Sequence, residues 1–278
     1  MTTPPALLIA GHGARDEAGA AAFRDFVQEL ARRNPGLPVA GGFVASAPTL
    51  GGAVTDLVER GVERFAAVPL TLVPPSPAEG DVPSALAREL ERHSGTSYAC
   101  GSALGPHPSL LKVLGRRLDE ALGGSARTPQ DRANVTVLLV ARGSADPEAN
   151  AEVHRAARLL WEGRGYAGVE TAFVSLAAPD VPSGLDRCVL LGARRIVVLP
   201  YFLLTGVLPE RLLQQTEGWA AAHPEIEVRT ADVIGPEEEL LDLVMERYRE
   251  VAGGDPRALQ HGHPHHDHDH EGTHAHAH

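Results

Sequence analysis

The sequence predicts an α/β protein of two homologous domains, each a parallel sheet flanked by helices. Short aliphatic runs typical of buried strands alternate with longer stretches of helical periodicity, which is the pattern of parallel sheets covered by helices. The second half of the chain also repeats the first. Three segments align in order at separations of 130, 131 and 130 residues: Leu7 with Val137, Gly61 with Gly192, and Leu104 with Ile234.

Each half gives the same order of elements: three strands that alternate with three helices, then a short strand and a closing helix. In the first half we expect strands at 7–10, 38–44 and 65–72, and helices at 18–32, 50–59, 83–93 and 110–122. In the second half we expect strands at 135–140, 168–174 and 195–202, and helices at 149–162, 184–191, 209–222 and 240–251. The domains are placed at 1–123 and 134–253, and the Gly-, Ser-, Arg- and Pro-rich segment 123–134 is interpreted as their linker.

Composition excludes several classes of protein. A formal net charge of −11 argues against a surface for nucleic acid or anionic membranes. No run of 18 apolar residues and no signal-peptide core is present, so we expect no membrane span and a cytoplasmic location. The two cysteines, Cys100 and Cys188, are far apart and form no C-x-x-C pair, so neither a disulfide framework nor a thiolate zinc site is expected.

The segment 254–278 differs from the rest of the chain. It holds nine of the 14 histidines, interleaved with Asp, Glu, Gly and Ala, and this composition forms no core. Imidazole is a ligand for Ni, Co, Cu and Zn ions, so we interpret the segment as a native, disordered metal-binding tail; a purification tag is the alternative. The histidines are His261, His263, His265, His266, His268, His270, His274, His276 and His278.

The stretch LLIAGHGARD, residues 7–16, places His12 between two glycines directly after the first strand. Ligands of open α/β sheets bind at the carboxyl ends of strands, so His12 is a candidate metal ligand, general base or phosphate-contacting residue. The repeat places Arg142 where His12 stands in the first half. We therefore expect His12 to hold a metal ion and Arg142 to face an anionic group. The alternative is a histidine that only caps or packs the loop.

These motifs resemble the two-domain sirohydrochlorin cobalto-, nickelo- or ferrochelatases of tetrapyrrole biosynthesis. GHGARD resembles the first-strand motif of that family; ARGSADPEANAEV at 141–153, ARLLWEGRGY at 157–166 and LPYFLLTGVL at 199–208 resemble its second-domain motifs. The likeness covers nearly all of residues 5–252, and it implies two chelatase-like domains that face each other across a cleft. It implies insertion of a divalent metal ion (Co²⁺, Ni²⁺ or Fe²⁺), as substrate, into sirohydrochlorin without ATP, and the absence of nucleotide motifs agrees.

The loop at 73–83 departs from the family pattern. A second family histidine usually follows the third strand, and Pro77 stands at that position here. Glu79, two residues on, is the candidate replacement as ligand or base; an ordinary solvated acid is the alternative. One histidine alone binds metal weakly, so we expect reduced activity. The runner-up hypothesis is a weak or inactive paralogue that binds metal or tetrapyrrole.

Sirohydrochlorin carries carboxylates, so the resemblance also predicts contacts with cations, hydroxyls and backbone N–H groups. The candidates are Arg15, Arg142, Ser144 and Thr205. Arg15 alternatively pairs with a neighbouring acid on the surface. A histidine-phosphatase activity is disfavoured, because Gly11 occupies the position of the arginine that such enzymes place before the nucleophile. Two fused domains supply both walls of a site, so we expect a monomer.

Overall fold

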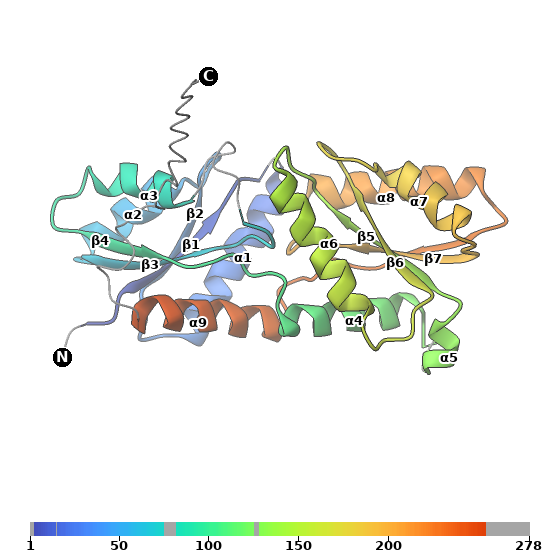
Figure 1. Cartoon of the computed structure of the whole chain (residues 1–278). Coiled ribbons are helices and arrows are strands. Elements are labelled where there is room, and N and C mark those ends of the chain that lie inside the picture. The colour runs from blue at the N-terminus through green and yellow to red at the C-terminus, as the bar shows by residue number, and fades with distance from the viewer. Residues whose placement is uncertain (1–2, 15, 75–81, 125–127, 254–278) are drawn as a thin grey trace, which may run out of the picture.

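The structure, a computed structural model, describes residues 3–14, 16–74, 82–124 and 128–253. It contains two four-stranded parallel sheets with strand orders β2-β1-β3-β4 and β6-β5-β7-β8 (Figure 1). The first sheet consists of β1 (Ala6–Gly11), β2 (Val39–Phe43), β3 (Arg64–Pro69) and β4 (Ser97–Cys100). The second consists of β5 (Thr136–Ala141), β6 (Gly168–Phe173), β7 (Arg195–Pro200) and β8 (Glu227–Thr230). The predicted α/β class and the repeat are confirmed.

Helices cover both faces of each sheet. On the first half these are α1 (Glu17–Arg33), α2 (Leu50–Glu59) and α3 (Val82–Leu90); on the second, α6 (Pro147–Trp161), α7 (Val181–Leu190) and α8 (Val207–Ala222). Alternate side chains of β1 enter different cores: Leu7 and Ile9 pack with α1, whereas Leu8 packs with α2 and α3. Burial on both faces explains why the central strands β1 and β5 are almost entirely aliphatic instead of alternating with polar residues.

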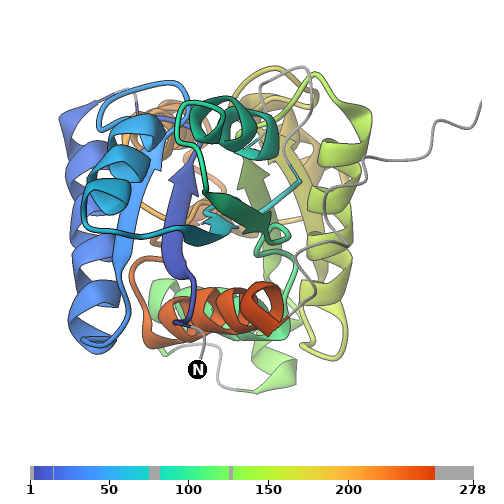
Figure 2. The same ribbon diagram turned by 90° about the vertical axis from the view of Figure 1, so that its left-hand side faces the viewer.

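The closing helices are exchanged between the halves. Helix α4 (Pro108–Ala121) ends the first repeat but packs on β7 and α6, and α9 (Glu238–Gly253) ends the second repeat but packs on β3 and β4. Figures 1 and 2 show the two helices on the same side of the molecule, with α9 beneath the first sheet and α4 beneath the second. One hydrophobic core therefore runs through both halves, and the Tyr248 hydroxyl donates to Pro5 O across it (2.7 Å).

Several element boundaries differ from those expected. Helix α7 begins at Val181, three residues earlier than predicted, because Asp180 caps it and Pro182 suits a first turn. Strands β3 and β7 end at Pro69 and Pro200, earlier than predicted. The linker contains a short helix, α5 (Pro129–Arg132), whose capping box joins Thr128 and Asp131.

Ion pairs fasten α4 to the start of α9. Arg117 donates to Val233 O and Ile234 O (both 2.9 Å) and pairs with Glu237. Arg116 pairs with Glu239 (2.9 Å), and this hydrogen bond lowers the pKa of the Glu239 carboxyl to about 2. The carboxylate therefore contributes stability above its ordinary pKa of 4.5, and that contribution is lost as the pH falls toward 2.

Replacing Arg117 by alanine is expected to lower the free energy of unfolding by about 2–4 kcal/mol, because a partly buried carboxylate and two carbonyls lose their donor. Urea unfolding of the full chain, followed by circular dichroism, measures the change. Arg92→Ala is the control: it removes an exposed pair between the last turn of α3 and the residues that follow it, and should cost less than about 1 kcal/mol. Equal costs would mean that the α4–α9 junction adds nothing to the stability of the fold.

No helix among the described residues is long and apolar enough to cross a membrane. Cys100 and Cys188 are both free, as expected, and burial raises the pKa of the Cys188 thiol to about 12.

Candidate active site

His12 lies directly after β1, on the loop that leads into α1, as predicted. The side chain is half-buried. The loop is held against the loop after β2, because the Ala45 N–H donates to His12 O (3.0 Å) and the Ala14 N–H donates to Ser46 Oγ (3.1 Å). These bonds fix the backbone on both sides of the imidazole.

Gly11 and Gly13, the two glycines beside His12, differ in the space that a side chain would have. A Cβ at Gly11 would lie 2.6 Å from the Phe43 ring, so the packing of that ring excludes any side chain there. A Cβ at Gly13 would meet nothing closer than Ser46 Oγ at 3.4 Å. Gly11 is thus explained by core packing, while Gly13 leaves backbone exposed beside the imidazole.

Asp16 joins the His12 loop to the second half. Its Oδ1 accepts from the Gly19 N–H and caps α1, and its Oδ2 accepts from the Val207 N–H at the start of α8; both distances are 2.6 Å. Gly206, the N-cap residue of α8, supplies no side-chain cap of its own. We call this pair of contacts the Asp16 bridge. It places one carboxylate at the positive ends of two helices, one from each half.

Thr205 lies at this junction, with an exposed side chain. Its carbonyl oxygen would be 3.5 Å from a Cβ at Gly19, in the first turn of α1. The loop after β7 therefore lies against the segment that follows His12. The two halves touch at a second place, where the Tyr201 hydroxyl would be 2.5 Å from a Cβ at Gly105. Burial raises the pKa of Tyr201, whose side chain is almost completely enclosed.

Arg142 follows β5, the neighbour of β7 in the second sheet, and is half-buried. Its carbonyl accepts from the Ser175 N–H (2.9 Å), which ties it to the loop after β6. The segments of His12, Thr205 and Arg142 therefore all lie at the carboxyl ends of strands, which is the place that the sequence predicts for His12.

Ser144 is placed differently from a typical ligand contact. It is only 5% exposed, and its Oγ accepts from the Asp146 N–H (3.0 Å). The Ser144 N–H donates to Asn150 Oδ1 (2.9 Å), and Asn150 Nδ2 donates back to Ser144 O (2.8 Å). Ser144 thus organises the turn that enters α6. Asn150 was not predicted, although a helical asparagine is itself a sign of local hydrogen bonding to backbone.

The remaining predicted site residues lie outside the described residues: Arg15, Glu79, Pro77 and the tail histidines from His261 to His278. Within the described part of the chain, no group of three or more His, Cys, Asp or Glu side chains is arranged to hold a metal ion. Among those residues His12 therefore has no ready-made set of ligands around it.

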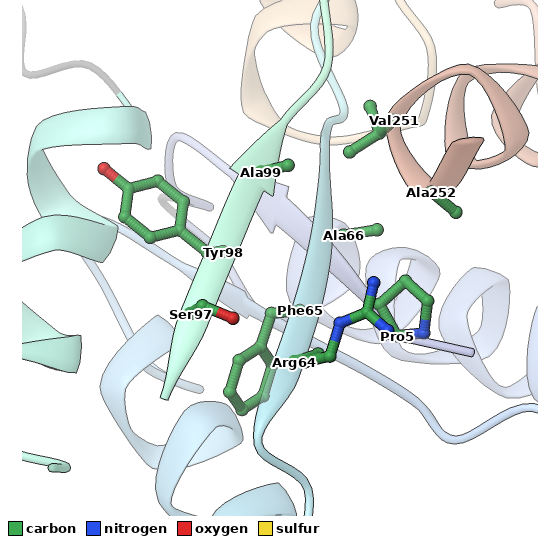
Figure 3. A pocket seen from close by; sticks show the side chains of 9 residues that line it. All are labelled: Pro5, Arg64, Phe65, Ala66, Ser97, Tyr98, Ala99, Val251 and Ala252. Carbon is green, nitrogen blue, oxygen red and sulfur yellow. The ribbon is translucent and has the colours of Figure 1, made fainter. Parts of the chain in front are cut away.

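Two hollows lie elsewhere on the first half. A cavity of about 20 Å³ lies at the amino ends of β3 and β4, between Arg64, Tyr98 and Val251 (Figure 3). It has room for about one water molecule, far too little for a macrocycle. A wider hollow of about 460 Å³ lies between α2 and α3, lined by Thr49, Arg88 and others. Neither is lined by His12, Arg142 or Thr205.

The fold and the site define a class of α/β proteins with two repeated halves whose carboxyl-end loops meet. A family model described as CbiX matches the chain twice, over residues 6–121 and 136–251. The chain therefore belongs to the CbiX family, which confirms the resemblance drawn from its motifs.

Named relatives cover most of the chain. It is 31% identical over 251 residues to the sirohydrochlorin cobaltochelatase of Priestia megaterium, covering 90% of this chain and 80% of that one. It is 28% identical over 215 residues to the sirohydrochlorin ferrochelatase of the same organism, covering 76% and 78%. The structure of SirB from Bacillus subtilis with Fe³⁺ matches with a TM-score of 0.75 at 23% identity, over 92% of this chain and 98% of that chain, which shows a shared fold.

Proposed function

We propose that this protein is a sirohydrochlorin chelatase that inserts a divalent metal ion, Co²⁺, Ni²⁺ or Fe²⁺, into the tetrapyrrole without a nucleotide. The observation that carries the proposal is the position of His12. It follows β1 on a backbone fixed from both sides, and the Asp16 bridge joins its loop to the Thr205 loop of the other half. The relatives named above are chelatases of this substrate, and they match the chain over both halves.

Metal insertion requires one group that binds the incoming ion and one group that accepts the pyrrole protons. Insertion forms four metal–nitrogen bonds and releases the two pyrrole N–H protons, so charge and atoms balance without a further reactant. A neutral imidazole performs either task near pH 7. We assign both to His12, and we assign Glu79 as the second ligand or base in place of the missing family histidine.

The substrate's carboxylates are assigned to the cations and polar groups around the same loops. Arg142 and Arg15 offer planar guanidinium groups, which bind carboxylates in a bidentate geometry. Thr205 offers an exposed hydroxyl. Ser144 is assigned a part through its turn, whose order positions Arg142. Both halves belong to one chain, so we infer that a monomer suffices, and we assign the protein to the cytoplasm.

The test is anaerobic incubation of sirohydrochlorin with each of the three ions, followed by absorbance. We expect the full chain to raise the insertion rate above that of the protein-free reaction for at least one ion, with no further change on adding ATP. A chain that ends at Leu259 should lose rate only when metal is limiting, if the tail histidines feed the site. Rates equal to the protein-free reaction for all three ions would contradict the proposal.

Pro77 favours one second candidate, a protein that binds tetrapyrrole or metal with little catalysis. Proline has no side-chain donor for a metal ion, so the loop at 73–83 lacks the ligand usual in the family. Pro77→His separates the candidates. A competent site should gain rate on the substitution, whereas a binding protein should show tetrapyrrole binding with no insertion before or after it.

A further inference from the structure

Leu176 has an unusual backbone conformation for its residue type. It has a φ of +67°, and among the described residues it is the one non-glycine with a positive φ. Its side chain is also 67% exposed, so burial of leucine in the core does not explain the conformation. A large apolar side chain held outward in a disfavoured conformation is a sign of a functional constraint.

The loop around Leu176 is fixed by its neighbours. The Ser175 N–H donates to Arg142 O and the Ala177 N–H donates to Ser175 O, both at 2.9 Å. Gly143 approaches the loop so closely that a Cβ there would lie 2.0 Å from Ser175 O, and its φ of +88° suits only glycine. These contacts hold the disfavoured backbone in place. They also fasten Leu176 to the Arg142 segment of the candidate active site.

The corresponding loop of the first half lacks this feature. Four residues separate Phe43 from Pro48, whereas five separate Phe173 from Pro179. In the shorter loop Ser46 lies half-buried, and its hydroxyl accepts from the Ala14 N–H beside His12. In the longer loop Leu176 points outward. The two halves thus carry different side chains in equivalent loops: a hydrogen-bonded serine in the first half and an exposed leucine in the second.

We propose that Leu176 is a substrate-contacting residue that packs on the apolar face of the tetrapyrrole ring and so contributes to its affinity. This rests on the proposed function. A tetrapyrrole combines a wide apolar ring with carboxylates at its rim, and Leu176 beside Arg142 offers an apolar surface next to a cation. Leu190 and Leu191 are as exposed, but they lie at the far end of α7, away from the carboxyl ends of the strands.

The proposal predicts that stability and binding move in opposite directions in one variant. Leu176→Gly relieves the positive φ, so the melting temperature should stay equal or rise by about 2–4 °C. The same change removes the apolar contact, so the dissociation constant for metal-free sirohydrochlorin should rise about tenfold. Leu176→Met keeps an apolar side chain and should bind within about twofold of the unaltered chain.

Titration of the full chain with metal-free sirohydrochlorin, read by absorbance, measures the binding, and Leu190→Ala is the matched control that should leave it unchanged. Weaker binding by Leu176→Gly alone supports the contact. Unchanged binding by Leu176→Gly, or equal weakening by Leu190→Ala, overturns it while the proposed function stands. Failure of the unaltered chain to bind sirohydrochlorin overturns the proposed function and this contact together.

Discussion

Replacing His12 by alanine is expected to lower the turnover number for metal insertion at least about 100-fold, the size of effect usual for loss of a positioned proton-transfer group. The imidazole stands on a loop that two hydrogen bonds fix to the neighbouring loop, and neither bond uses the side chain. The alanine variant should therefore keep its fold and its Michaelis constant for the tetrapyrrole. Steady-state absorbance assays with saturating metal separate the two constants.

His93→Ala is the matched control for this experiment. His93 belongs to the same half, but it follows the last turn of α3 and does not belong to a loop that leaves a strand. Its Nε2 contacts the Thr55 hydroxyl (3.3 Å). Its loss should leave turnover unchanged. Full turnover in His12→Ala would show that another group, with Glu79 as the first candidate, performs both metal binding and proton transfer.

The position of His12 was predictable because it depends on local signals. An aliphatic run of strand length ends at glycine, and a capping aspartate then starts a helix, so the histidine between them lies at the carboxyl end of the strand. The short helix α5 had an equally local signal, the Thr128–Asp131 capping box, which was overlooked within a segment interpreted as a linker.

The exchange of α4 and α9 was not predictable in the same way. Both helices have an apolar stripe, which predicts that one face is buried but carries no information on which sheet buries it. Arg116 and Arg117 fasten the exchanged helices through partners that lie over 115 residues away along the chain. Long-range pairs of this kind have no spacing rule, and two of the partners of Arg117 are backbone carbonyls.

Ser144 and Leu176 show which features of the candidate site the sequence does not predict. Ser144 was predicted as a substrate contact from its place in the motif, and its burial and bond to the Asp146 N–H became evident only from the fold. Leu176 lies in none of the motifs that indicate the function. The one available signal was the extra residue in 174–178 relative to 44–47, which an alignment of the two halves reveals.

Asp16→Asn is expected to lower kcat/KM about 10- to 100-fold, because it breaks the Asp16 bridge without removing an N-cap. Asparagine caps a single helix as well as aspartate does. At this position, however, each carboxylate oxygen accepts from a different helix at 2.6 Å, and an amide has only one acceptor oxygen. Its NH₂ group would then face the N–H of Gly19 or Val207. The loops of His12 and Thr205 would separate, and misplacement by about 1 Å costs up to about 100-fold in rate.

Asp180→Asn provides the comparison that isolates the bridge. Asp180 caps α7 through one oxygen, which accepts from the Ser183 N–H (2.9 Å), and both partners belong to one half. Its asparagine variant should keep both activity and melting temperature. Steady-state insertion assays and thermal unfolding of both variants measure the difference. If Asp16→Asn matches Asp180→Asn in both measurements, Asp16 is only a cap of α1, and the two loops keep their spacing through the exchanged helices and the shared core.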